Sequence, residues 1–312
     1  MKRLFIIGNG FDLSHGMETS YADFQEYLRQ AYPDANGEEM ILPSGTLMPK
    51  GGVDYEDEEV VSFLMHIISN AELDGDKWSD LENTLGILEF DACFDTLSPV
   101  LDKEGDYDDW KNMYNKSDLA VDLVVPCIKI SEFFTDWINT IEINDNITNK
   151  EDFAKLIDEK NDLFLNFNYT KTLEIIYQVE NVCHIHGQQG EHLLFGHGNN
   201  TDYYEDDMSK FTGAEDSLQQ IQDALRKNTT EALEDNIDFF DEISSSVDKI
   251  YSYGFSFSKV DEIYIEKICN ILKTENIIWY LNDYDPFNVR KYYKKIIQNC
   301  GFKGKFRTYH IA

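Results

Sequence analysis

Three things that this sequence lacks narrow the classes of protein to which it can belong. It has only five cysteines, widely spread and with no C-x-x-C pair, which argues against a structural zinc site and a disulfide framework. It has no apolar run of membrane length, and only Leu4, Phe5, Ile6 and Ile7 precede the first glycine. We therefore expect reduced thiols and a cytoplasmic protein that is neither secreted nor inserted in a membrane.

Positive charge is also scarce. Lysine and arginine number 27 against 59 acidic residues, and the formal net charge is -32. Such a charge disfavours long-range attraction to nucleic acid or to an anionic membrane. An alternative is that the acidic surface imitates a nucleic acid and occupies a basic groove of a partner, although solubility alone explains most acidic surfaces.

What the sequence does contain is apolar and aromatic material for a core, with 42% hydrophobic residues. The run Arg3-Leu-Phe-Ile-Ile7 ends in glycine and is typical of a strand buried on both faces of a parallel sheet. Similar strand patterns recur at 163–167, 182–185, 193–195, 249–253, 277–281 and 305–309. Helical patterns at 170–177, 259–272 and 286–298 alternate with them, which predicts an α/β fold, a Rossmann-like mainly parallel sheet with helices on both faces.

The rest of the chain predicts helical insertions into a single α/β domain over 1–312. A mostly helical elaboration is expected over 34–160, with a surface loop at 34–55 and helices at 58–69, 79–90 and 120–138. A further helix is expected from Ser20 to Leu28. The very acidic segment 199–247 is expected to be a helical insertion, either a lid over a ligand or a solvated cap.

The first chemical motif is the turn Gly8-Asn-Gly-Phe-Asp-Leu-Ser-His-Gly16, directly after the first strand. Gly8 and Gly10 allow a tight turn and a close approach of the backbone, and amides at the following helix start would face phosphates. The spacing G-x-G-x5-G differs from that of hydride-transfer enzymes. It predicts a cradle for a nucleotide diphosphate, and the alternative is a tight turn without a ligand.

Two more motifs lie where predicted strands end. In Asn166-Phe-Asn-Tyr-Thr170, the Asn168 amide and the Thr170 hydroxyl are placed either to contact a ligand or to cap a helix.

In His184-Ile-His-Gly187, the alternation of side chains along a strand puts both histidines on one face. We expect His186 to act in acid or base chemistry and His184 to support packing. With His192 and His197 nearby, metal ligation is the alternative, without regular metal spacing.

The last two motifs are less specific. In Tyr253-Gly-Phe-Ser-Phe-Ser258, Gly254 and Ser256 could reach a second phosphate or a ribose, or Ser258 could simply cap the next helix. In Trp78-Ser-Asp-Leu-Glu82, both acidic residues could complement a helix dipole.

Taken in order, these motifs resemble the AbiH family of bacteriophage abortive-infection proteins, and the order is also similar to that of the sirtuin-type NAD fold. The resemblance implies that Gly8, Gly10 and Gly16 form a phosphate loop. It implies that Asn168 lies beside the nicotinamide ribose, that His186 is catalytic, and that Gly254 and Ser256 form a late cofactor loop. The remaining residues of these motifs taken as cofactor-binding are Asn9, Phe11, Asp12, Thr170 and Gly187.

Two departures from the sirtuin pattern matter. Thr170 stands where an acid is usual, and the zinc-binding cysteines of the deacetylases are missing, so protein deacetylation is not expected. The resemblance implies a phage-defence protein that binds NAD or a related nucleotide and hydrolyses NAD to nicotinamide and ADP-ribose, without a metal. The alternatives are a non-catalytic nucleotide sensor and a metal-dependent nuclease using the histidines. A homo-oligomer and a phage-derived trigger are left open as partners.

Overall fold

The computed structural model describes residues 2–49, 51–72, 78, 80–144 and 146–311. The chain divides into two compact units. The first contains residues 1–20, 138–194 and 228–312, and the second contains 21–137 and 195–227. These boundaries differ from the segments expected above, because 138–160 belongs to the first unit and the acidic segment 199–247 is divided at residue 227.

The first unit is built on a six-stranded sheet with the order β5-β4-β1-β6-β7-β8, in which every pair is parallel. The strands are β1 (Lys2–Ile7), β4 (Leu163–Asn166), β5 (Val182–His184), β6 (Val247–Tyr253), β7 (Ile278–Asn282) and β8 (Lys305–Tyr309). After β1 the chain adds strands on one side and then returns to add β6, β7 and β8 on the other. This is the strand order of doubly wound dinucleotide-binding sheets, and the predicted fold class is confirmed.

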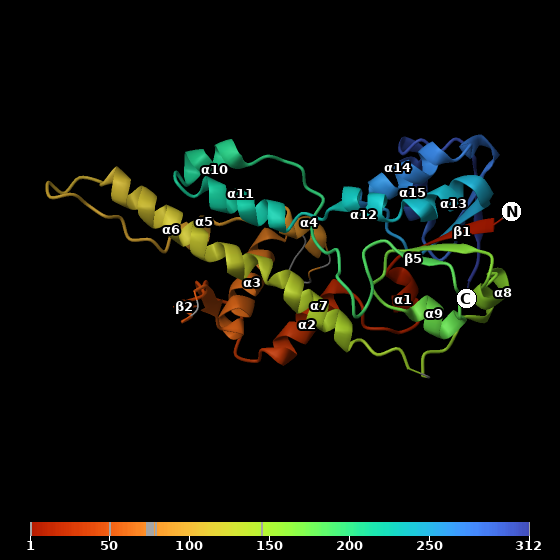
Figure 1. Ribbon diagram of the computed structural model, residues 1–312, viewed down its shortest axis with the longest axis horizontal. Coiled ribbons are helices and arrows are strands. Elements are labelled where there is room, and N and C mark those ends of the chain that lie inside the picture. The colour runs from red at the N-terminus through yellow and green to blue at the C-terminus, as the bar shows by residue number, and fades with distance from the viewer. Residues whose placement is uncertain (1, 50, 73–77, 79, 145, 312) are drawn as a thin grey trace. The chain divides into compact units, whose positions relative to one another are not determined.

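Helices cover both faces of this sheet (Figure 1). One face carries the core cluster to which Leu4, Ile6 and Ile250 contribute, and the other carries the cluster that contains Phe5 and Ile7. Because both faces of the sheet are covered, β1 is apolar at each position from Leu4 to Ile7. Helices on the first face are α12 (Thr229–Asp235), α13 (Ile237–Ser246), α14 (Glu262–Ile271) and α15 (Phe287–Asn299), and those on the second are α1 (Gly10–Ser14), α8 (Glu151–Leu156) and α9 (Thr172–Tyr177). Two short 3-10 turns are η1 (Lys259–Asp261) and η2 (Thr274–Asn276).

In the part of the second unit that the structure describes, the regular elements are helices and one hairpin. Its helices are α2 (Tyr21–Ala31), α3 (Asp57–Ala71), α4 (Leu81–Leu85), α5 (Asp91–Phe94), α6 (Asp109–Ile128), α10 (Tyr204–Lys210) and α11 (Glu215–Ala224). Helix α7 (Ile130–Thr140) begins in this unit, and its residues from Ile138 belong to the first. Within the unit, α6 packs against α3 and α11.

Three sequence expectations about elements need correction. The strand expected at 193–195 is absent; instead Phe195 stacks on Phe134, with ring centroids 4.0 Å apart. The loop expected at 34–55 contains a hairpin of β2 (Gly45–Leu47) and β3 (Val53–Tyr55). The helix expected over 79–90 is only the five-residue α4, and Ser79 lies outside the described residues.

Among the described residues, no helix combines the length and the apolar character that crossing a membrane requires.

Candidate functional site

The parallel register brings the carboxyl ends of the strands to one edge of the sheet. Ile7 at the end of β1 is aligned with Asn166 of β4 and with Tyr253 of β6. Asn166 is in turn aligned with His184 of β5. The loops that follow β1, β4, β5 and β6 therefore begin at neighbouring points, and they carry most of the predicted site residues.

The glycines after β1 and β6 lie against each other. The Gly8 amide donates to the Tyr253 carbonyl at 3.0 Å, and the Gly10 amide donates to the Gly254 carbonyl at 2.9 Å. A Cβ on Gly10 would lie 2.7 Å from the Gly254 Cα, and Gly254 has a φ of +64°. These glycines therefore permit two turns to touch through their backbones, and the amides of Gly8 and Gly10 are already engaged by protein carbonyls.

A cavity of about 520 Å³ opens beside this contact, at the carboxyl ends of β1, β6, β7 and β8. This is the place where the strand order reverses, at which open α/β sheets bind their ligands. Its volume lies in the range usual for small-molecule sites. Three of the predicted residues line it, Gly10, Gly254 and Ser256. The other lining residues are Leu13, Ser14, Lys150, Tyr253, Phe255, Asn282, Tyr284, Asp285, Tyr293 and Ile311.

A buried polar network lies on the β4 side of β1. The Thr170 hydroxyl donates to Asp12 Oδ2 at 2.5 Å, and the Asn168 amide donates to the Gly8 carbonyl at 3.2 Å. Asp12 is 1% exposed, and its Oδ1 has no hydrogen-bond partner among the residues that the structure describes. Burial raises the pKa of Asp12 to about 6, partly offset by hydrogen bonds from Thr170 and Thr172. A carboxyl that titrates this close to neutrality is suited to proton transfer.

The two motif histidines face opposite sides of the sheet, so the expectation of a shared face is wrong. Strand β5 ends at His184, whose Nε2 lies 2.6 Å from Glu174 Oε1 of α9. His186 follows in a turn and packs on Tyr264 of α14, with ring centroids 5.5 Å apart. Its Nε2 lies 3.5 Å from Asp261 Oδ1.

His186 is 3% exposed and does not line the cavity. Its ring packs on Phe167 at 5.3 Å, and Phe167 packs on Phe255 at 4.4 Å. Because Phe255 lines the cavity, two aromatic rings separate His186 from that space. Asn168, 5% exposed, is likewise absent from the lining.

The remaining predicted residues have local structural contacts. The Asn9 side chain exchanges hydrogen bonds with Thr19, both at 2.7 Å. Phe11 is fully buried in the second core cluster. Gly16 and Gly187 both have positive φ, +76° and +83°, and so turn the chain where other residues would be strained.

Sequence reasoning missed several residues of this region. Asn282 and Asp285 line the cavity from the end of β7, and the rule that ligands bind at carboxyl ends of strands could have indicated both. Asp261 could have been found from its spacing to Ser258, because the Ser258 hydroxyl donates to Asp261 Oδ2 at 2.8 Å. No sequence signal marks Lys150, which reaches the cavity from the segment before α8.

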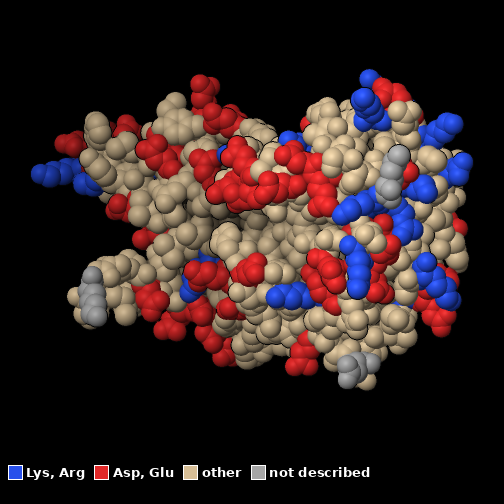
Figure 2. Space-filling model, turned by 45° about the vertical axis from the view of Figure 1, so that its right-hand side comes forward, with Lys and Arg blue, Asp and Glu red and all other residues tan. Residues whose placement is uncertain are grey.

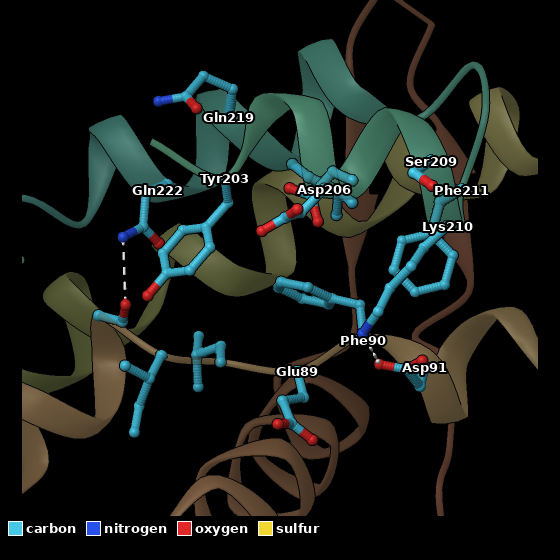
Figure 3. A pocket seen from close by; sticks show the side chains of 15 residues that line it. Glu89, Phe90, Asp91, Tyr203, Asp206, Ser209, Lys210, Phe211, Gln219 and Gln222 are labelled. Carbon is cyan, nitrogen blue, oxygen red and sulfur yellow. Dashed lines mark hydrogen bonds and ion pairs between the residues drawn. The ribbon is translucent and has the colours of Figure 1, made fainter. Parts of the chain in front are cut away.

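A second cavity, of about 590 Å³, belongs to the second unit (Figure 3). It lies between the segment 86–91 and helices α10 and α11, with Phe90 and Phe211 among its apolar walls. Lys210 lies 3.5 Å from Asp91 across it, and none of the residues predicted to form the site lines it.

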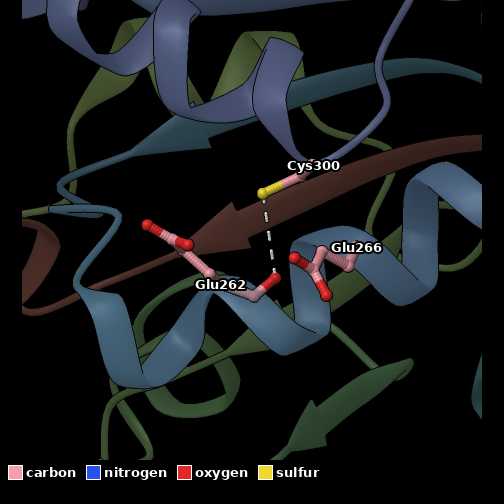
Figure 4. A group of neighbouring side chains, drawn as sticks. All are labelled: Glu262, Glu266 and Cys300. Carbon is pink, nitrogen blue, oxygen red and sulfur yellow. Dashed lines mark hydrogen bonds between the residues drawn. The ribbon is translucent and has the colours of Figure 1, made fainter.

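The four histidines expected as alternative metal ligands are not gathered in the described part of the chain. There, one group of three ligand-type side chains lies close together, Glu262, Glu266 and Cys300 (Figure 4). Burial raises the pKa of Cys300 to about 11, so its thiol is protonated at neutral pH and is a poor ligand. Glu262 is already paired with Lys259 at 2.6 Å.

The motif at 78–82 has a structural role in the second unit. Glu82 Oε1 lies 2.5 Å from the ammonium of Lys227, whose side chain is 1% exposed. Asp80 accepts two hydrogen bonds from the Asn83 side chain, both at 2.8 Å. Glu82 lies in the first turn of α4, where it can complement the helix dipole, and it also neutralises a buried lysine.

Comparison with known proteins gives one match. Residues 4–283 match the family model described as bacteriophage abortive infection AbiH. No curated protein and no solved structure matches the chain. The family model spans nearly the whole chain and includes every motif discussed above. The match supports a role in abortive infection by bacteriophage. This chain therefore belongs to the AbiH family.

Proposed function

We propose that this chain acts in abortive infection, in the bacterial cytoplasm, by binding NAD or a related nucleotide at the cavity beside Gly10 and Gly254. The observation that carries the proposal is the position of this cavity, where the order of a doubly wound parallel sheet reverses. Backbone turns without side chains form part of its wall, which lets a ligand approach closely.

The charges of the first unit are compatible with an anionic ligand. That unit has 17 basic and 25 acidic residues, whereas the second has 10 basic and 34 acidic residues. Figure 2 shows how widely acidic side chains spread over one face of the molecule. Lys150 is the basic side chain among the described residues that line the cavity, and we assign it to the nucleotide phosphates.

A dinucleotide on this fold extends across the point of reversal. One nucleotide would occupy the cavity, and the other would extend over the ends of β4 and β5. Asn168 and His186 lie at those two ends. Both are buried, so the proposal requires the second nucleotide to displace part of the aromatic packing around Phe167.

We further propose that bound NAD is hydrolysed. Water would attack C1′ of the nicotinamide ribose, and nicotinamide would leave with the bonding electron pair, becoming neutral. His186 would accept the proton released by the water, and Asn168 would orient the ribose. The observation favouring this chemistry is that Asp261, itself held by Ser258, faces the ring nitrogen of His186.

Calorimetric titration with NAD and with ADP-ribose tests the binding proposal. We expect Lys150→Ala to weaken binding about tenfold, since it removes one charged contact to phosphate. Lys273→Ala is the matched control, because Lys273 is exposed and precedes β7 at the opposite edge of the sheet. Absence of binding to the unmodified protein, or equal loss in both variants, would overturn the assignment of the cavity.

Incubation with NAD, followed by chromatography of nicotinamide and ADP-ribose, tests hydrolysis. We expect His186→Ala to lower turnover at least about a hundredfold, as loss of a general base does. His192→Ala is the control, because that histidine is exposed in the same region. Binding without turnover would leave the non-catalytic sensor as the function, and degradation of nucleic acid that a chelator stops would support the nuclease.

A further inference from the structure

The cavity of the second unit has more acidic than basic side chains in its walls. Asp91 of α5 and Asp206 and Asp207 of α10 line it, and Glu89 lines it with its carboxylate directed away from α10 (Figure 3). Lys210 is the basic side chain among the described residues that line the cavity, and it pairs with Asp91. The carboxylates of Asp206 and Asp207 form no salt bridge with any of the described residues, so their negative charge is not neutralised by the protein.

Asp207 is the carboxylate of this cavity that is most withdrawn from water. It is half-buried, whereas Asp91 and Asp206 are exposed. Burial raises the pKa of Asp207, the charge of Lys210 lowers it, and the charges of Asp206 and Asp91 raise it further. A cation bound beside Asp207 would offset this repulsion between like charges.

Aromatic side chains form another part of the wall. Phe90 and Phe211 are buried, and the ring of Tyr203 points from the start of α10 toward the segment 86–91 (Figure 3). Aromatic faces attract cations, and the rings also offer an apolar surface to an alkyl chain.

One amine of the protein itself already lies in this environment. The Lys210 ammonium is 3.5 Å from Asp91 Oδ2 and 5.9 Å from the centroid of the Phe211 ring. The walls of the cavity therefore hold an ammonium group between a carboxylate and an aromatic ring, and a further carboxylate, Asp207, is left for a second cation.

The positions of the carboxylates disfavour a chelated metal ion. A divalent metal needs several oxygen ligands close to one another. In the described part of the chain, the group of three ligand-type side chains that meets this condition is that of Glu262, Glu266 and Cys300 in the first unit. The volume of about 590 Å³ is instead in the range of sites for small organic molecules.

We propose that this cavity binds an organic cation, an ammonium or guanidinium group carried on an aliphatic chain. The charged group pairs with Asp207, and the aliphatic chain packs on Phe90 and Phe211. Such a group can belong to a free polyamine or to a lysine or arginine side chain of a partner protein. The proposal does not depend on nucleotide binding, because every residue that lines this cavity belongs to the second unit.

Calorimetric titration of the full chain with spermidine tests the proposal. In about 0.15 M sodium chloride, which screens long-range attraction, we expect one saturable site per chain. Asp207→Asn should weaken binding about fivefold, because a half-buried charge contact is lost. Asp118→Asn is the matched control: it removes the same charge from an exposed position of α6 that does not line the cavity.

A second pair of variants tests the competition with the amine of the protein. Lys210→Gln should strengthen spermidine binding about threefold, because Asp91 then becomes available to the ligand. Lys103→Gln is its control, since Lys103 is exposed in the same unit and does not line the cavity. This pair decides the matter if Asp207→Asn lowers the thermal unfolding midpoint.

A peptide with one arginine flanked by glycines is the second probe, and it separates the two sources of the cation. Tighter binding of the peptide would assign the site to a side chain of a partner protein, and tighter binding of spermidine would assign it to a free polyamine. Failure of both probes to bind would overturn the proposal. Many weak sites per chain, or equal effects in each variant and its control, would also overturn it, because they indicate attraction to the acidic surface in general.

Discussion

At the scale of single residues, Asp12 is the most unusual side chain in the first unit. The motif predicted it as a cofactor-binding residue, and the structure places it in a buried network beneath the glycine turn. Its carboxyl is held by the hydroxyl groups of Thr170 and Thr172, and no lysine or arginine of the described residues forms a salt bridge with it. The cost of ionising it there should be visible in the stability of the protein.

Because the pKa of Asp12 is raised to about 6 on folding, the native state binds its proton more tightly than the unfolded state. The stabilisation that the Asp12 proton provides is therefore fully present below about pH 4, and it is lost as the pH rises through about 6. Relative to Asp12→Asn, the parent protein should lose roughly 2 kcal/mol of unfolding free energy between pH 4 and pH 7. Urea denaturation at both pH values measures this difference, and parallel curves would contradict it.

Gly254 is constrained by the backbone that touches it. A Cβ there would lie 2.2 Å from the Phe11 amide nitrogen and 2.4 Å from the Gly10 carbonyl carbon. We expect Gly254→Ala to destabilise the protein by about 3 kcal/mol or more, because the clash adds to the strain of a positive φ. Gly16→Ala is the control: its φ is also positive, but its Cβ would meet nothing within 4 Å. Equal unfolding midpoints for both variants would contradict this account.

The sequence allowed a correct prediction for those residues whose position in the cavity follows from the parallel direction of the strands alone. Gly10, Gly254 and Ser256 line one cavity because each follows a strand of a parallel sheet. The sequence pattern gave the wrong face for His186. Side chains alternate between the two faces only within a strand, and β5 ends at His184. The residue roles in NAD chemistry stay predictions.

At the scale of elements, the strands of the sheet were predictable and the small hairpin was not. Strand β4 and the last four residues of β1 are buried, and their apolar runs reveal them. Strand β2 is exposed at all three positions, so its residues have no pattern that distinguishes them from a loop. The run 193–195 is apolar for another reason: Phe195 completes an aromatic cluster with Phe134.

The buried pair of Glu82 and Lys227 joins α4 to the segment after α11 within the second unit. Replacing Lys227 with Met should destabilise the protein by about 3 kcal/mol, since it leaves the carboxylate largely buried without a counter-charge. The double variant Glu82→Met with Lys227→Met should recover part of that loss. Chemical denaturation of the parent protein, the two single variants and the double variant measures the coupling, and purely additive losses would contradict a direct interaction.

At the scale of the whole molecule, the division into two units could not be derived from local patterns. The second unit joins 21–137 to 195–227, segments that 57 residues separate in the chain. Composition nevertheless differs between the units, because the net charge is -8 in the first and -24 in the second. The family match accounts for the order of the motifs and does not describe this division.

Repulsion between the many negative charges of the folded protein should weaken when salt is added. Raising sodium chloride from about 0.05 M to 0.5 M shortens the screening length to a few ångströms and should raise Tm by a few degrees at pH 7.5. Close to the sequence pI of 4.4 the same addition should have little effect, which separates screening from general salt effects. A Tm that falls with salt at pH 7.5 would contradict the expectation.

The contact of Gly10 with Gly254 limits which substitutions can change the cavity beside it. A wall made of main-chain atoms presents the same chemistry whatever substitutions accumulate around it, and Gly10 and Gly254 themselves have no room for a side chain. Substitutions that change the chemistry of the cavity are then confined to its side chains, among them Asn282, Tyr284 and Asp285 at and after the end of β7. The fold therefore fixes the position of the backbone wall, whereas the side chains around it set the polarity and charge of the cavity.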